Sequence, residues 1–145
     1  MRIKTIVADY QQKRDFMKKL FVSVPMKGRT EEEIKASVQK MKKIAEICEG
    51  EELELIDSYI EDNPPKDSKE AVWYLGESLK KLAQADVFIG INDAWGWNEC
   101  YIENDVASRY GIKNYHIPAQ YVINDYNSLC NKSHMSVCNE AMPTF

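Results

Sequence analysis

The strongest constraint on the fold of this chain is a short apolar run that leads into an amphipathic segment. The run VFIGI, at residues 87–91, is too short for a helix and rich in residues that favour strands, so we expect a buried strand. After a loop, Ile102, Val106 and Tyr110 recur every four residues, which predicts a helix. Open α/β sheets bind ligands at the carboxyl ends of their strands, where each strand leads into a helix. We therefore expect the functional site in this region.

The same alternation of strand and helix extends over most of the chain. We expect strands at residues 20–24, 53–57, 86–93, 113–117 and 121–123, and helices at residues 30–48, 68–82 and 99–110. This order predicts an α/β fold with a flavodoxin-like, doubly wound parallel sheet of four to five strands and three main helices. The compact domain is expected at residues 17–126, after an extension or edge element at 1–16 and before an irregular tail at 127–145.

Helical spacing also predicts which side chains are buried. Cys48 falls on the apolar face of the helix at 30–48, whereas Glu49 falls on its solvated face. In the helix at 68–82, Val72 falls on the apolar face. The segment between the second strand and this helix contains adjacent prolines and several acids, which predicts a long surface loop that could act as a lid or as a plain connection.

Composition and charge argue against several classes of function. The 145 residues carry a net charge of −4 without a basic stripe, so we expect no nucleic-acid partner. The cysteines form no CxxC pair and only two histidines are present, so we expect no metal site and no cofactor. No apolar run is long enough to span a membrane, and we expect a cytoplasmic protein without a membrane partner.

The loop after the first strand, residues 23–30, is a candidate anion site. It places a glycine, two cations and hydroxyl groups at the start of a helix, where free backbone N–H groups attract anions. The candidate ligand-binding residues in this loop are Ser23, Pro25, Met26, Lys27, Gly28 and Arg29. The alternative is a tight turn before a capped helix, because Thr30 and Glu33 have the spacing of a capping box.

The loop after the strand at 86–93 is a candidate binding surface for a flat ring. Trp95 and Trp97 could enclose a nucleobase between their faces, beside the polar side chains of Asp93 and Asn98. The two tryptophans could instead fill an interface between subunits. The sequence leaves both interpretations open.

Two glutamates in the following helix are candidates for catalysis. Glu99 and Glu103 are four residues apart, so both carboxylates face the same way, towards a site or towards solvent. Glu103 is expected about one turn into the helix, near the positive end of the dipole, where it is easily kept ionised. An ionised carboxylate suits a nucleophile or a general base. Cys100 lies near the same helix start, but no histidine is near in sequence to act as its base.

Several motifs together resemble one family. They are FVSVPMKG at residues 21–28, LxxLxxADV at 79–87, and Glu103-x-x-x-Ala107 before a Gly-Ile pair at 111–112. This pattern is similar to the nucleoside 2-deoxyribosyltransferase superfamily, in its small, often phage-encoded branch. The resemblance covers about residues 18–118. That superfamily includes N-glycosidases that act on 2′-deoxynucleoside 5′-monophosphates.

The resemblance implies a flavodoxin-like fold, a homodimer or higher homo-oligomer, and cleavage of the bond between base and deoxyribose. Glu103 falls at the position of the nucleophile that attacks C1′, and a second base or water then resolves the intermediate. Asp93 and Asn98 fall in the loop that lines the sugar, and Asp93 is a second catalytic candidate. The residues that fall near the 5′ end of the substrate are Ser23, Gly28 and Arg29.

The chain departs from the family pattern at two places. Ser78 occupies the position of an aspartate that protonates or orients the base, and Cys100-Tyr101 replaces a pair of small residues before the nucleophile. Ser78 therefore remains a ligand-binding candidate. The alternative function is a non-catalytic protein that binds a nucleotide or an ADP-ribose-type signal, as a sensor or a phage anti-defence sponge. A third interpretation is a structural subunit without a ligand.

Overall fold

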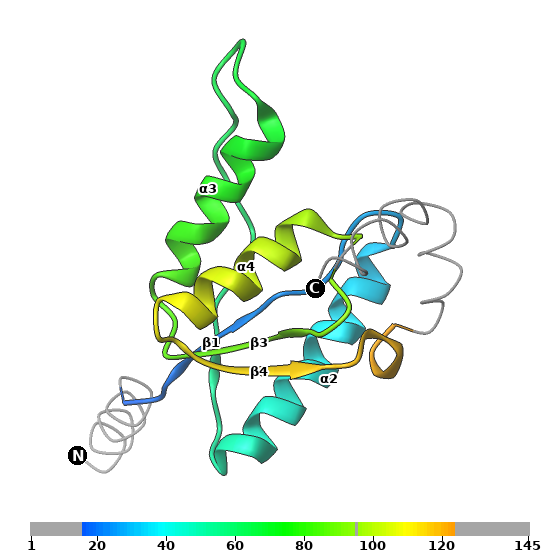
Figure 1. The fold of residues 1–145 in the computed structure, drawn as a ribbon, viewed down its shortest axis with the longest axis vertical. Helices are drawn as coiled ribbons and strands as arrows, with labels where there is room; N and C mark the ends of the chain where they lie inside the picture. Colours follow the sequence, from blue (N-terminus) through cyan, green and yellow to red (C-terminus); the bar gives the residue numbers. More distant parts are fainter. Residues whose placement is uncertain (1–15, 95, 124–145) are drawn as a thin grey trace, which may run out of the picture.

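A computed structural model describes residues 16–94 and 96–123, which form an α/β fold with a four-stranded sheet (Figure 1). The strands are β1 (Lys19–Val22), β2 (Glu54–Leu55), β3 (Val87–Ile91) and β4 (Lys113–Ile117). The helices are α2 (Glu31–Glu49), α3 (Glu70–Leu82) and α4 (Asn98–Arg109), and a 3₁₀ helix, η1, follows at Ala119–Tyr121. All strand pairs are parallel, in the order β2-β1-β3-β4. This confirms the flavodoxin-like, doubly wound fold.

The two faces of the sheet are covered by different helices. On one face Leu20 and Ile89 belong to a core cluster with Met41 of α2. On the other face Phe21 and Phe88, which lie side by side in register, pack with residues of α3 and α4. β3 is buried along its whole length, which is the reason for its continuous apolar run. The site is thus built at the ends of strands that are fixed on both sides.

Local sequence signals determine both ends of α2. The Thr30 side chain accepts a hydrogen bond from the backbone N–H of Glu33 at 3.2 Å, as an N-cap residue does. At the other end Gly50 adopts a left-handed backbone, with φ of 74°, and its N–H donates to the carbonyl of Glu46. The helix predicted at 30–48 is therefore confirmed to within a residue at each end.

The strand predicted at 121–123 is wrong. The backbone N–H groups of Tyr121 and Val122 donate to the carbonyls of Pro118 and Ala119, which makes a 3₁₀ turn and not a fifth strand. Val122 and Ile123 are buried in the core. Their apolar side chains, which suggested a strand, are therefore explained by burial at the end of a turn. The expected extension and tail, at 1–16 and 127–145, lie outside the described residues except for Phe16.

Three predictions of burial are also wrong. Val72 is 66% exposed, because the N-terminal half of α3 projects beyond the sheet (Figure 1). Cys48 is exposed, since the buried face of α2 is made by Ser37, Met41 and Ala45. Glu49, expected in solvent, has a side chain only 2% exposed. Among the described residues, no helix has the length and apolar character needed to cross a membrane.

Candidate functional site

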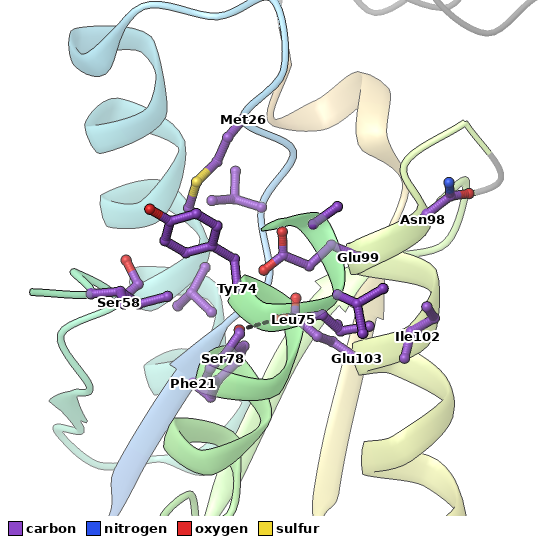
Figure 2. Close-up of a pocket in the computed structure, with 15 residues that line it drawn as sticks. Phe21, Met26, Ser58, Tyr74, Leu75, Ser78, Asn98, Glu99, Ile102 and Glu103 are labelled. Carbon is purple, nitrogen blue, oxygen red and sulfur yellow. Dashed lines mark hydrogen bonds between the residues drawn. The ribbon is translucent and has the colours of Figure 1, made fainter. Parts of the chain in front are cut away.

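The carboxyl group of Glu103 is the centre of the candidate site. Glu103 lies on α4 and is only 4% exposed, and each of its oxygens accepts a hydrogen bond from another element. Ser23, which directly follows β1, donates to Oε1 at 2.7 Å, and Ser78 of α3 donates to Oε2 (Figure 2). The backbone N–H of Ser23 donates to the carbonyl of Ile89 in β3 at 2.9 Å. Two strands and two helices therefore fix the position of this carboxyl group.

Burial controls the charge of Glu103. Removal from water raises the pKa of its carboxyl from 4.5 to about 7, although the hydrogen bonds from Ser78 and Ser23 oppose this change. The helix start therefore does not keep the pKa of Glu103 low, contrary to the expectation from the sequence. α4 begins at Asn98, so Glu103 lies in the second turn, where the dipole is weak compared with desolvation.

Glu103 and Ser78 line a cavity of about 590 Å³. Its volume lies in the range of small-molecule sites, and most of its wall is apolar. The apolar wall includes Phe21 and Val22 of β1, Tyr74 and Leu75 of α3, and Ile102 of α4. Figure 2 shows the carboxylate of Glu99 pointing from α4 towards Tyr74, on the same side as Glu103. The structure thus brings both glutamates to one cavity.

Several lining residues were missed from the sequence. Ser58 and Ile60 come from the irregular segment between β2 and α3, and no local pattern marks them. Tyr74 lies four residues before Ser78, so the two share a face of α3, and this spacing could have identified Tyr74. The loop predicted before α3 therefore contributes to the site.

The loop after β1 lies beside the same cavity. Met26 lines it, and Pro25 and Lys27 line an adjoining pocket of about 290 Å³ together with Trp97, Asn98 and Glu99. Asn98 also lies on the rim of the main cavity, with its amide pointing away from Glu103 (Figure 2). The two predicted loops therefore meet, as the topology of a parallel sheet requires.

Arg29 is directed towards α2 and does not line the cavity. Its guanidinium donates to the Ser37 hydroxyl at 2.6 Å, to the carbonyl of Pro25 at 3.0 Å and to that of Glu33 at 3.3 Å. Partial burial lowers the pKa of Arg29. Ser37 in turn donates to the carbonyl of Val122 at 3.0 Å, so this cation joins the loop to two other segments.

Three further sequence candidates lie away from the cavity wall or outside the described chain. Gly28 is exposed and adopts a φ of 78°, which explains a glycine in this turn. Asp93 is half-buried in the loop after β3 and is not among the residues that line the cavity. Trp95 lies outside the described residues.

Cys100 is not suited to nucleophilic chemistry. It is 3% exposed, and burial raises the pKa of its thiol to about 12, so a thiolate is disfavoured. Within residues 16–94 and 96–123, no group of three or more histidine, cysteine, aspartate or glutamate side chains could hold a metal ion. The chemistry available at this site is therefore that of a buried carboxyl group and hydroxyls.

Comparisons with protein-family models, with curated proteins and with solved structures give no match. The family resemblance consequently depends on the motifs quoted above. What the site can do must be inferred from its own geometry and from the chemistry of the side chains that line it.

Proposed function

We propose that this chain is an N-glycosidase or 2-deoxyribosyltransferase that acts at C1′ of nucleosides or nucleotides, with Glu103 as the nucleophile. The burial of Glu103 at the cavity wall carries this proposal. The carboxyl group of Glu103 is buried and hydrogen-bonded to two serine hydroxyls, and no lysine or arginine among the described residues forms an ion pair with it. Burial of a carboxyl group without a positively charged partner lowers the stability of the fold. Such a group in a cavity is a candidate for catalysis. The motif resemblance supplies the reaction class.

The proposed reaction uses the ionised form of Glu103. One carboxylate oxygen attacks C1′, the C1′–N bond breaks, and its electron pair leaves with the base. Water or a second base then attacks C1′ and releases the carboxylate. Ser23 and Ser78 hold the two oxygens in place and favour the ionised form, because both donate hydrogen bonds to them.

The roles of the first loop are revised in this proposal. The resemblance places Ser23 and Arg29 near the 5′ end of the substrate, but Ser23 donates to Glu103 and Arg29 donates to α2. We assign Ser23 to positioning the nucleophile and Arg29 to fixing the loop. Lys27 and Asn98 keep their assignment as ligand contacts, because they line the pocket that adjoins the cavity.

Incubation with a panel of deoxynucleosides and their 5′-monophosphates, which includes a derivative with a positively charged base, tests the proposal. Free base, measured by chromatography, is expected with the wild-type chain and is expected to fall at least a hundredfold in Glu103→Gln. Glu52→Gln is the matched control, because Glu52 is exposed and does not line the cavity. The absence of base release, or equal release by Glu103→Gln, contradicts an enzymatic role.

The second candidate is a protein that binds a nucleotide or an ADP-ribose-type signal and leaves it intact, as a sensor or a sponge. A specific observation favours it: burial raises the pKa of Glu103 to about 7, so its protonated form is populated near neutral pH. A neutral carboxyl donates a hydrogen bond and does not attack C1′. A thermal shift with recovery of the intact ligand by mass spectrometry distinguishes this candidate from the enzyme.

We further propose that the chain is cytoplasmic and forms a homodimer or higher homo-oligomer. Val72 is 66% exposed on the half of α3 that projects beyond the sheet, and Tyr59 is 69% exposed in the segment before this helix (Figure 1). Exposed apolar side chains of this size are consistent with a surface that a second copy covers. Light scattering after size-exclusion chromatography measures the assembly. A monomer at micromolar concentration contradicts the oligomer.

A further inference from the structure

The cavity at Glu103 is acidic. Glu99 and Glu103 line it, whereas no lysine, arginine or histidine of the described residues does so. Glu99 also lines the adjoining pocket, where Lys27 offsets its charge. The remaining wall is apolar or carries neutral polar groups, and Tyr74 contributes an aromatic ring. A ligand with a positive charge therefore complements this cavity better than an anion does.

The neighbouring elements do not reverse this charge. The guanidinium of Arg29 donates to two carbonyls and to Ser37, so it is directed away from the cavity. The first turn of α2 contains Glu31, Glu32 and Glu33, whose carboxylates already complement the positive end of that helix. Among the described residues, the lysines nearest the cavity are Lys27 and Lys35, which line adjoining pockets and not the wall around Glu103.

Within residues 16–94 and 96–123, the cavity wall also offers no second buried acid that could protonate a departing base. A neutral purine or pyrimidine leaves readily only if an acid protonates it. Glu103 acts as the nucleophile in the proposed function, Ser78 carries a hydroxyl with a much higher pKa than an acid, and Glu99, the other carboxyl of the described wall, is exposed. A base that is already a cation needs no proton, because it leaves as a neutral molecule with the electron pair of the C1′–N bond.

We propose that this site selects nucleosides whose base is cationic, such as a purine or pyridine ring quaternised at a ring nitrogen. The proposal depends on the glycosidase function above. The Glu103 oxygen bonds to C1′, the C1′–N bond breaks, and its electron pair neutralises the ring. Water then attacks C1′, loses its proton to solvent and releases the Glu103 carboxylate. Glu99 and the face of Tyr74 stabilise the ring cation before it leaves.

Binding of a stable matched pair tests the charge preference without catalysis. The probes are 1-methylnicotinamide, a cation, and nicotinamide, its neutral analogue, each titrated calorimetrically into the full chain. We expect the cation to bind about tenfold more tightly, and we expect Glu99→Gln to reduce this preference severalfold. Glu52→Gln, an exposed charge outside the cavity, should leave the preference unchanged. Equal affinities for the two probes would overturn the inference.

Cleavage of a second matched pair separates this inference from the proposed function. The substrates are 7-methyl-2′-deoxyguanosine and 2′-deoxyguanosine, which differ by one methyl group and one positive charge. The ratio of their kcat/KM values is compared between wild type, Glu99→Gln and Glu52→Gln, so that the greater intrinsic lability of the methylated substrate cancels.

We expect the ratio to fall severalfold only in Glu99→Gln. If base release requires Glu103 but Glu99→Gln leaves the ratio of the two kcat/KM values unchanged, the selectivity is overturned and the glycosidase function is retained. A binding preference for the cation without release from either substrate retains the selectivity and overturns the glycosidase. The absence of both overturns both proposals.

Discussion

Glu103 makes the stability of the fold depend on pH, because its carboxyl group has a different pKa in the folded and in the unfolded chain. Its pKa is about 7 in the folded chain and near the ordinary 4.5 when unfolded, so folding favours the protonated form. The free energy of unfolding therefore falls as pH rises from about 4.5 to about 7, by about 3 kcal/mol from this group. Glu103→Gln should remove this loss, so the stability gained by the variant should grow with pH across that window.

Urea denaturation at several pH values between 4.5 and 8 measures this difference. The relevant quantity is the pH dependence of the gap between the variant and the wild type, because a change in the hydrogen bonds alone shifts the curve equally at every pH. Glu52→Gln, which removes an exposed carboxylate outside the cavity, is the control. Parallel curves for Glu103→Gln and the wild type would contradict the burial of an ionisable carboxyl at this position.

Ser78 should set the pH at which Glu103 becomes active. Its hydroxyl donates to Oε2 and lowers the pKa that burial has raised, so Ser78→Ala should move the midpoint of the pH–rate profile upwards from about 7. The rate at neutral pH should then fall severalfold, with recovery at higher pH, and Ser78→Thr should restore much of it. Ser68→Ala, which removes a hydroxyl that donates to the Pro65 carbonyl away from the cavity, is the control. An unchanged midpoint in Ser78→Ala would refute this role.

At the scale of elements, β3 and α4 approach each other so closely that one residue of the strand must be glycine. A Cβ added at Gly90 would collide with the Asn104 side-chain oxygen of α4 and would lie 2.8 Å from Cε1 of Phe88. The Asn104 amide meanwhile donates to the carbonyl of Ile91 at 2.8 Å, which joins the helix to the end of the strand. This contact holds α4, and with it Glu103, against the sheet.

Gly90→Ala should therefore lower the free energy of unfolding by about 1–3 kcal/mol, the usual cost of overpacking a core. Chemical denaturation measures the change. Gly76→Ala is the matched control: nothing lies within 4 Å of a Cβ at this helical position in α3, so the exchange should stabilise the chain by about 1 kcal/mol. A neutral Gly90→Ala would show that α4 can shift away from β3 at little cost.

At the scale of the whole molecule, Glu49 ties the ends of three elements together at the sheet edge opposite the site. Its Oε1 accepts from the Tyr115 hydroxyl and lies 2.8 Å from the Lys113 ammonium, and its Oε2 lies 3.4 Å from the Lys18 ammonium. Tyr115 and Lys113 lie on β4, Lys18 directly precedes β1, and Glu49 itself is the last residue of α2. The hydrogen bonds from Lys113 and Tyr115 lower the pKa of Glu49.

Glu49→Gln should lower the free energy of unfolding at neutral pH by about 1 kcal/mol, because the ammonium groups of Lys18 and Lys113 are exposed and screened by water. The sign with pH is opposite to that of Glu103. A lowered pKa stabilises the fold above the ordinary value of 4.5 and loses this effect as pH falls below it, so the variant and wild type should converge in acid. Thermal unfolding between pH 3 and pH 7 measures this convergence. A constant gap would show that the charge of Glu49 contributes nothing.

The fold was predictable because its signals are local. The buried run of β3, the Thr30 cap of α2 and the glycine that ends this helix can each be read within a few residues. The predicted strand at 121–123 failed for the opposite reason: an apolar side chain is buried equally well in a strand or in a turn, and only the available hydrogen-bond partners decide between them.

The candidate site was predictable only in outline. Parallel topology brings the loops after β1 and β3 to one edge, so Ser23, Met26 and Glu99 could be assigned together from their order in the chain. The direction of each side chain could not be predicted, because it depends on contacts with segments that are distant in sequence. Arg29 illustrates this, since Ser37 and two carbonyls attract its guanidinium away from the cavity.

The amino-acid sequence by itself determined the order of elements, the parallel sheet and the candidacy of Glu103, because periodicity and caps act within one or two turns of the chain. Only the tertiary structure decided the charge state of Glu103, the direction of Arg29 and the burial of Glu49. The physical reason is that desolvation and side-chain hydrogen bonds depend on neighbours that are far away in sequence. Ser23 lies 80 residues from Glu103 and still donates to its carboxyl group.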